Sequence, residues 1–232
     1  VRFFYRETVK KAKLKYGMKN RRMYPSDAYA LCMVCSLLGK ELTPKYAFVF
    51  VDEAQDISKN EYDLLMRINC KASFDVFGDL EQNVTAWRGV GDWRAAFPDF
   101  EVFTLNQNYR NTNQIVDFVA SALKVDMQSI GFDGPEVQHI APRGISAFFR
   151  GKKGLKAVIC SEKDKEKYLR KAYSVVSEKG RVSRTRINLM SVYESKGLEF
   201  TSVAVVPAHM TPNEKYIAYT RALKELAIVE EK

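Results

Sequence analysis

The sequence is poor in cysteine and histidine and contains no long hydrophobic run. Its four cysteines, Cys32, Cys35, Cys70 and Cys160, are too few and too scattered for a disulfide framework. No apolar stretch approaches the ~20 residues that a helix needs to cross a bilayer. Charges interrupt the N-terminus at once, which argues against a secretory signal peptide. We therefore expect a soluble, globular, intracellular protein without a membrane partner.

The cysteines and histidines do not assemble into a recognisable metal site. Cys32 and Cys35 have the spacing of a redox or zinc pair, but no second pair or nearby histidine completes it. Apolar neighbours at helical spacing favour a packed helix with buried thiols. His139 and His209 are isolated in the sequence, so we expect them to be structural or exposed.

Charge is distributed unevenly along the chain, whose formal net charge is +9. Residues 1–40 carry +8 and residues 147–196 carry +9, whereas residues 41–146 carry −7. Two basic blocks around an acidic middle indicate a polyanion partner and a separate site rich in carboxylates. Ordinary solvated surface is the alternative, and we favour it for residues 162–171, whose mixed charge is typical of an exposed helix. For the basic run 10–22, nucleic-acid contact and plain solubility both remain open.

Strands and helices are predicted to alternate. The continuous apolar run 46–51 is typical of a strand buried on both faces of a parallel sheet. Capping boxes at 58–61 and 211–214 predict helix starts. Further strands are predicted over 73–77, 101–105, 157–160, 187–192, 202–206 and 226–229, and further helices over 115–123 and 162–171. Polar residues follow several strands, so the pattern predicts an open α/β sheet with its chemistry at the carboxyl ends of its strands.

An acidic pair directly follows the first predicted strand. Asp52 and Glu53 place two carboxylates within reach of one Mg²⁺ and its waters, so that one could hold the metal while the other accepts a proton from an attacking water. Asp-Glu alone would also suit a plain acidic turn. Gly78, Asp79 and Gln82, one strand later, disfavour that alternative.

Together these segments resemble the UvrD/Rep/PcrA group of superfamily-one DNA helicases, with features of the helicase IV/HelD-like branch. Five motifs in the order of that family carry the resemblance: residues 51–56 (motif II), 78–82 with 86–89 (motif III), 105–111 (motif IV), 191–200 (motif V) and 216–222 (motif VI). The resemblance implies P-loop NTPase, RecA-like parallel sheets flanked by helices. Residues 1–100 would form the end of a first RecA-like domain with a basic N-terminal helical segment, and residues 101–232 the second RecA-like domain.

The resemblance also implies ATP and Mg²⁺ as cofactors. Asp52 would organise the metal, and Glu53 would orient or deprotonate the hydrolytic water. Gln82 would sense the γ-phosphate through an amide that can both donate and accept. Arg110 and Arg221 would neutralise the charge that develops on transfer.

Six further residues are assigned to nucleotide binding by the same resemblance. Tyr109 would stack near the base or sugar, and Glu199 would hydrogen-bond the ribose. The set is completed by Gln55, Asp79, Lys196 and Gly197.

DNA contacts are assigned to Trp87, Arg88 and Tyr193. Trp87 would stack on a base of a single strand, and core packing is the alternative for its indole. Thr85 stands where relatives place an aromatic, and Val192 with Tyr193 stands where motif V usually has Thr and His. These departures put part of the stacking in doubt.

A phosphate-binding loop of the form Gly-x-x-x-x-Gly-Lys-Ser/Thr is absent from the sequence. Without this Walker A loop the β- and γ-phosphates lose their backbone cradle and lysine, and Mg²⁺ loses a ligand. We therefore expect the chain alone to hydrolyse ATP poorly. The sequence also lacks an initiator Met, and we expect it to be the carboxyl-terminal part of a helicase whose loop lies upstream.

The leading interpretation is an ATP-driven DNA helicase or translocase, of 3′–5′ polarity by resemblance. It would act on single-stranded or partly duplex DNA, with repair proteins as further partners, in the cytoplasm at the nucleoid. One alternative is a non-catalytic module for interaction or DNA clamping. Another is a remodeller of RNA polymerase or RNA that uses the same motor.

Overall fold

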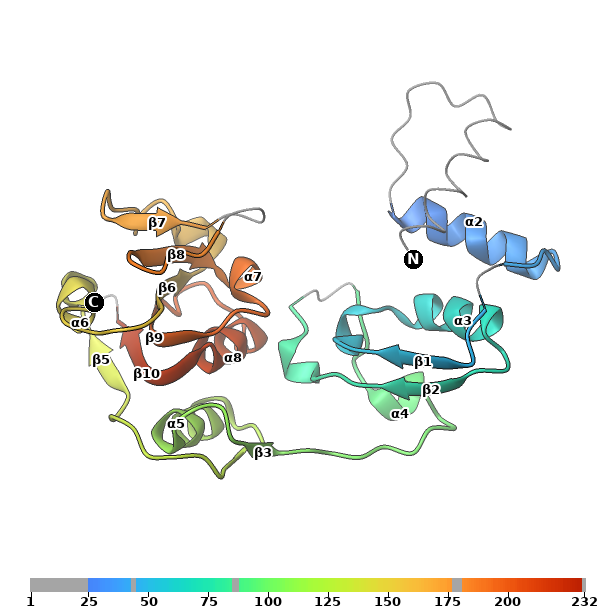
Figure 1. Ribbon diagram of the computed structural model, residues 1–232, viewed down its shortest axis with the longest axis horizontal. Coiled ribbons are helices and arrows are strands. Elements are labelled where there is room, and N and C mark those ends of the chain that lie inside the picture. The colour runs from blue at the N-terminus through green and yellow to red at the C-terminus, as the bar shows by residue number, and fades with distance from the viewer. Residues whose placement is uncertain (1–24, 43–44, 85–87, 177–180, 231–232) are drawn as a thin grey trace, which may run out of the picture. The chain divides into compact units, whose positions relative to one another are not determined.

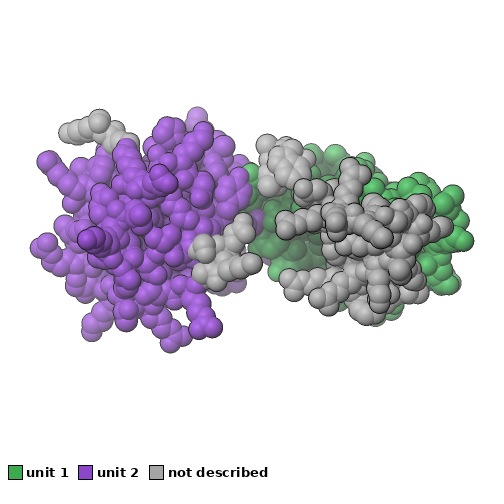
Figure 2. Space-filling view, turned by 90° about the horizontal axis from the view of Figure 1, so that it is seen from above, with its two compact units in different colours: residues 1–100 green, residues 101–232 purple. Residues whose placement is uncertain are grey.

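The computed structural model describes residues 25–42, 45–84, 88–176 and 181–230. The chain divides into two compact units, residues 1–100 and 101–232, which Figure 2 shows in different colours. We describe each unit by itself.

Unit 1 is built around a parallel β-α-β arrangement (Figure 1). Its elements are α2 (Pro25–Leu37), β1 (Phe48–Val51), the 3₁₀ turn η1 (Ala54–Asp56), α3 (Lys59–Ile68), β2 (Ser73–Val76), the 3₁₀ turn η2 (Leu80–Gln82) and α4 (Trp93–Ala96). The predicted capping box is present at the start of α3, where Ser58 and Glu61 bond each other's backbone N–H groups. This part of the prediction is confirmed.

The prediction that the first strand is buried on both faces is wrong. Only one face of β1 is covered: Val51 is buried, whereas Phe48 and Phe50 are 67% and 68% exposed. In the part of unit 1 that the structure describes, β1 pairs only with β2, and its covered face packs on a core that includes Tyr62 and Phe97. An apolar run therefore identifies a strand without showing how many layers cover it.

Unit 2 contains a six-stranded parallel sheet in the order β5-β10-β9-β6-β8-β7. Its strands are β5 (Gln138–Ile140), β6 (Lys156–Cys160), β7 (Tyr173–Val175), β8 (Ile187–Ser191), β9 (Phe200–Val205) and β10 (Ala222–Val229). The helices are α5 (Asn113–Leu123), α6 (Ile145–Phe148), α7 (Val192–Ser195) and α8 (Pro212–Thr220). Shorter pieces are the ribbon of β3 (Gln107–Asn108) and β4 (Gln128–Ser129) and the 3₁₀ turns η3 (Pro142–Gly144) and η4 (Glu162–Asp164).

Both faces of the large sheet are covered. On one face Phe148 and Phe149 pack with Val158 and Leu189 in a continuous core. Helices α5 and α8 contact each other and β10 on the other (Figure 1). Consecutive residues of β6 and β9 are buried, as expected for strands at the centre of a parallel sheet. The α/β class, with parallel strands flanked by helices, is thus confirmed.

Two predicted elements of unit 2 are wrong. Residues 101–105 form no strand, and Leu105 is 96% exposed, because this stretch finds no strand partner among the described residues. Residues 162–171 form the short turn η4 and further turns instead of a helix. There Ser161 caps the turn, and Lys165 is bound by Glu194 and the carbonyl of Val176. Tertiary contacts outweigh helix propensity in this segment.

The isolated cysteines and histidines have structural surroundings. Cys32 is buried and Cys35 half-buried on α2, and both are free thiols. His139 bonds the exposed Glu230, and His209 bonds Asp164. No helix among the described residues is long and apolar enough to cross a membrane.

Candidate functional site

The acidic pair lies on a tight turn directly after β1. The backbone N–H of Glu53 donates to Asp52 Oδ1 at 2.9 Å, and Glu53 adopts a left-handed conformation with φ 53°. Such a conformation costs a residue other than glycine about 1–2 kcal/mol. Contacts of the next residue fix the turn: the N–H of Ala54 donates to the Phe77 carbonyl at 2.9 Å, and its carbonyl accepts from the Tyr62 hydroxyl at 2.7 Å. Both carboxylates are thereby held at the exposed carboxyl end of the strand.

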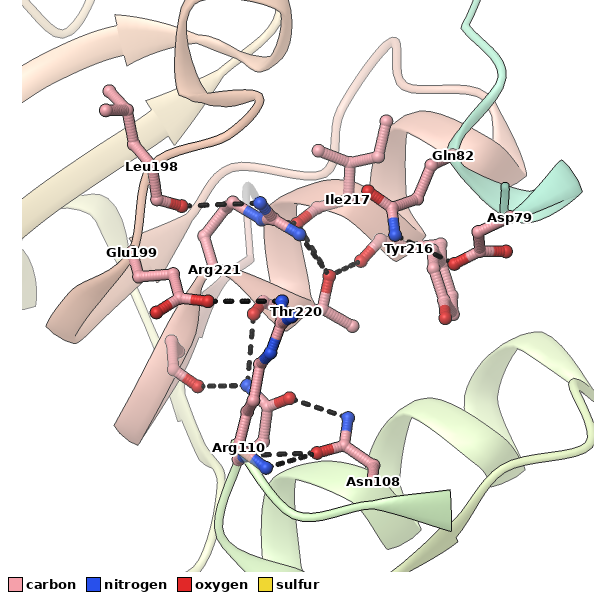
Figure 3. Close-up of polar contacts among 12 residues, drawn as sticks. Asp79, Gln82, Asn108, Arg110, Leu198, Glu199, Tyr216, Ile217, Thr220 and Arg221 are labelled. Atoms are coloured by element: carbon pink, nitrogen blue, oxygen red, sulfur yellow. Dashed lines mark hydrogen bonds and ion pairs between the residues drawn. The ribbon is translucent and has the colours of Figure 1, made fainter. Parts of the chain in front are cut away.

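Gln55 joins this turn to the segment after β2. Its Nε2 donates to Glu53 Oε2 at 2.8 Å, and its Oε1 accepts the backbone N–H of Asp79 at 3.0 Å. The Asp79 carboxylate accepts from Gln82 Nε2 at 2.8 Å and from the N–H of Glu81 at 3.0 Å; Figure 3 shows the bond between Asp79 and Gln82. Four predicted site residues of unit 1 therefore form one continuous hydrogen-bonded network.

The donor set of this turn fits a magnesium ion. Mg²⁺ is typically held by one or two carboxylates together with waters and substrate phosphates, and Asp52 and Glu53 supply two adjacent carboxylates. No group of three or more His, Cys, Asp or Glu side chains suited to a metal occurs among the described residues. The turn thus suits a hydrated Mg²⁺ that is shared with a phosphate, and it does not suit an all-protein metal cage.

In unit 2, the predicted motif IV residues form a hydrogen-bonded turn. Asn108 Oδ1 accepts the backbone N–H groups of Arg110 and Asn111 at 2.9 and 3.1 Å (Figure 3). The buried Asn111 then donates through Nδ2 to the carbonyls of Thr220 and Ala222, at 3.0 and 2.6 Å. This one side chain fixes the turn beside Arg221, the residue between those two carbonyls.

The two arginines of unit 2 differ in exposure. Arg110 extends toward Glu199, with 3.3 Å between Nη1 and Oε1, and both side chains are substantially exposed. Arg221 is 6% exposed and donates to the carbonyls of Ile217 and Leu198 at 3.2 and 3.3 Å (Figure 3). Arg110 is therefore adjustable, whereas Arg221 is held by the backbone.

These residues lie at the amino-terminal edge of the sheet. Glu199 immediately precedes β9 and Arg221 immediately precedes β10, and the Phe200 N–H donates to the Arg221 carbonyl at 2.9 Å. The expectation that the chemistry lies at the carboxyl ends of the strands holds for Asp52 and Asp79 in unit 1 and is wrong for this cluster. A short helix and loop carry the chain from the end of β8 back to the start of β9, and Glu199 comes at the end of that return.

A cavity of about 210 Å³ lies beside the same turn. It is lined by residues 105–110, Asp126, Met127 and Tyr216. Tyr109, which is 68% exposed, offers an accessible ring there. The cavity is therefore placed to receive a flat ligand group close to Arg110.

The remaining predicted residues are distributed as follows. Arg88 forms an ion pair with Glu61, with 2.7 Å between Nη2 and Oε1. Lys196 and Gly197 lie in the loop between α7 and β9, where Gly197 has a positive φ of 76°. Tyr193 is exposed on α7. Trp87, with Thr85 and Ala86, lies outside the described residues.

Two important residues escaped sequence reasoning. Asn111 occurs within the motif IV segment, but nothing in the sequence indicates that its amide reaches residues 220 and 222. Glu61 was expected only as a helix cap, yet it also binds Arg88. The first contact spans more than a hundred residues, so local patterns carry no signal for it.

Comparison with known proteins bears on unit 1. Residues 14–91 match the family described as UvrD/REP helicase N-terminal domain. This segment is UvrD-like. The match contains β1, β2, both turns that carry the hydrogen-bonded network and Gly89.

Individual relatives agree with this assignment. The chain is 33% identical over 78 residues to the ATP-dependent DNA helicase Rep of Escherichia coli, covering 31% of this chain and 12% of that protein. It is 30% identical over 86 residues to the ATP-dependent DNA helicase PcrA of Staphylococcus epidermidis, covering 34% and 12%. The matched part therefore spans about an eighth of the length of these relatives.

Solved structures with a similar fold are also helicases. An Arterivirus nonstructural protein 10 (helicase) in complex with DNA is 18% identical, with a TM-score of 0.49, covering 82% of this chain and 41% of that chain. A PRRSV helicase structure is 16% identical, also with a TM-score of 0.49, covering 78% and 34%. We base no conclusion on these likenesses.

Proposed function

We propose that this chain forms part of an ATP-dependent DNA helicase or translocase. In this proposal, unit 1 is the end of a first RecA-like domain and unit 2 is a second. The observation that carries the proposal is that the network from Glu53 through Gln55 and Asp79 to Gln82 lies within the UvrD-like segment. Rep and PcrA, which match the same segment, are ATP-dependent DNA helicases by name.

Unit 1 would hold the metal and the water. Asp52 would bind Mg²⁺ directly or through its waters, and Glu53 would accept a proton from the water that attacks the γ-phosphate. Bound Mg²⁺ would neutralise phosphate charge. Gln82, which is held by Asp79 at 2.8 Å, would report the phosphate to the rest of unit 1. The phosphate-binding loop that this sequence lacks would come from another part of the helicase.

Unit 2 would supply cations and a binding surface for the base. Arg110 would exchange the Glu199 carboxylate for a phosphate oxygen, a change that costs little because the pair is exposed. Arg221, held by two carbonyls, would present a fixed charge. Tyr109 would stack on the nucleotide in the adjoining cavity, Glu199 would then bond the ribose, and Lys196 and Gly197 would shape the neighbouring loop.

Single-stranded DNA would be bound by basic surface and stacking side chains. We assign this contact to Trp87, Arg88 and Tyr193, with movement in the 3′–5′ direction. Such binding depends on counterion release and on aromatic stacking, so it should be independent of sequence and should weaken steeply with salt.

Fluorescence anisotropy of a labelled oligonucleotide across a salt series tests the DNA contact. We expect weak binding at low salt, and a further loss of ~1–3 kcal/mol for Trp87→Ala if the indole stacks on a base. Trp93→Ala is the matched control, because Trp93 packs on Phe97 inside unit 1 and should affect stability rather than DNA affinity. A salt-independent signal, or none at very low salt, would leave the basic blocks as ordinary solvated surface.

Nucleotide turnover separates the motor from a non-catalytic module. We expect negligible steady-state ATP hydrolysis by this chain, with or without single-stranded DNA, because it lacks the phosphate-binding loop. Turnover at helicase-like rates that Glu53→Gln abolishes would show that expectation to be wrong. Binding of a fluorescent ADP analogue with Mg²⁺ that weakens on Asp52→Ala would favour the motor over a clamping module.

A further inference from the structure

Gln55 makes more connections than a nucleotide-binding side chain requires. It is 1% exposed, and its amide bonds Glu53 on one side and Asp79 on the other. Its backbone carbonyl accepts the N–H of Val90 at 3.1 Å and Asn83 Nδ2 at 3.2 Å. One buried residue thereby contacts the carboxylate turn, the segment after β2, and both ends of the loop from Asn83 to Val90.

Two glycines are needed to bring these segments so close to Gln55. A Cβ at Gly78 would lie 2.7 Å from Gln55 Oε1, and a Cβ at Gly89 would lie 2.1 Å from the Gln55 carbonyl oxygen. Gly89 also has a φ of 104°, which side-chain-bearing residues rarely adopt. The close approach is thus built from both sides.

We propose that Gln55 is a positioning residue that couples the Glu53 carboxylate to the loop from Asn83 to Val90. The coupling rests on the proposed function for its purpose, since Glu53 belongs there to the nucleotide and the loop leads to the DNA contact at Arg88. Gln55 itself touches neither ligand in this role. A change in the direction or charge of Glu53 is passed on by the Gln55 side chain and peptide.

The planar amide explains how the coupling works. Nε2 and Oε1 belong to one rigid group, so a rotation that follows Glu53 also moves Oε1 away from the Asp79 N–H. A glutamine that only filled space would not need a donor on one side and an acceptor on the other. Because both bonds lie in a buried setting, leaving either group unpaired is costly.

Two substitutions separate coupling from packing. Gln55→Met keeps the size and removes both bonds. Gln55→Glu keeps the acceptor for Asp79 but places a carboxylate against Glu53, and two carboxylates at this distance share a proton only at low pH. Asn69→Leu is the matched control, because Asn69 is also a buried amide of unit 1 and binds Tyr46 and Leu65 instead.

The experiment is amide hydrogen exchange of the ¹⁵N-labelled chain from pH 4 to 8, with each variant compared with wild type at the same pH. For Gln55→Met we expect exchange about tenfold faster at Asp79 at every pH, from loss of one net hydrogen bond, and a smaller increase at Val90. For Gln55→Glu we expect near wild-type exchange at low pH and faster exchange as pH rises. Asn69→Leu should leave both amides unchanged.

The outcomes decide the proposal without help from ligands. It is overturned if Val90 does not respond to either variant, or if the effect of Gln55→Glu does not depend on pH. If Gln55→Met fails to fold, the low-pH and high-pH states of Gln55→Glu still make the comparison. DNA affinity that follows the same pH profile in Gln55→Glu supports the functional role. Complete absence of DNA binding, with exchange as expected, would overturn the helicase function and leave the coupling intact.

Discussion

The two units place their candidate residues at opposite edges of their sheets. In unit 1, Asp52 and Asp79 follow β1 and β2, whereas in unit 2, Glu199 and Arg221 precede β9 and β10. Unit 1 holds its groups by side-chain bonds, chiefly through Gln55. Unit 2 holds Arg221 by backbone carbonyls. Related motifs on similar sheets can therefore use either edge, and the means of support differs with the edge.

The units also differ in how completely their sheets are covered. Central strands of unit 2 are buried on both faces, while β1 of unit 1 exposes Phe48 and Phe50 on one face. A substitution on a central strand should therefore cost far more than one on the open face.

The largest expected effect is on the core of unit 2. Leu189→Ala, at a fully buried position of β8, should lower the free energy of unfolding of this unit by ~2–5 kcal/mol. Phe48→Ala removes a larger but exposed side chain and should change unit 1 by less than about 1 kcal/mol. Urea unfolding followed by amide signals of each unit measures both. Equal costs would remove the contrast in coverage.

Asn111 tests the support of the unit 2 cluster. Asn111→Ala would leave the buried carbonyls of Thr220 and Ala222 without this donor and should cost ~1–3 kcal/mol. Asn113→Ala is the control, because Asn113 bonds the exposed carboxylate of Asp133 and should cost less. The same unfolding measurement applies. An equally mild effect of both variants would mean that the backbone holds Arg221 without Asn111.

A pH effect is expected in unit 2 from Asp164. Burial raises the pKa of this carboxyl, but hydrogen bonds from Ser161 and His209 outweigh burial and hold the pKa below its ordinary value. The folded state thus favours the charged form, so its stabilisation is present above the unfolded pKa of about 3.9 and is lost as pH falls through the folded value. Melting temperatures from pH 2.5 to 6 should fall less steeply for Asp164→Asn. The exposed Asp117→Asn should keep the wild-type slope.

The smallest effect concerns the exposed ion pair. A double-mutant cycle of Arg110→Ala and Glu199→Ala should give a coupling of ~0.2–1 kcal/mol that shrinks in high salt. Chemical unfolding at two salt concentrations provides the measurement. A coupling above 2 kcal/mol would contradict the view that Arg110 exchanges partners easily.

Sequence reasoning succeeded where local chemistry decides the outcome. Capping boxes predicted the starts of α3 and α8, and apolar patterns predicted β6, β8 and β9. It failed where a long-range partner decides, as for residues 101–105 and 162–171. The carboxylate turn was predicted as a site, but the buried bonds of Gln55 depend on a left-handed turn and two close glycines, which no periodicity reveals.

The strand order of unit 2 has a consequence for its biosynthesis. β10, the last strand in the sequence, lies between β9 and β5, and β5 pairs with no other strand in this sheet. During translation β5 must wait without a strand partner until β10 leaves the ribosome, so the sheet closes only after most of unit 2 has been made. Such late, non-local pairing slows folding and leaves open edges exposed meanwhile. The unit therefore depends on chaperone protection of the nascent chain more than unit 1, whose paired strands are separated by one helix.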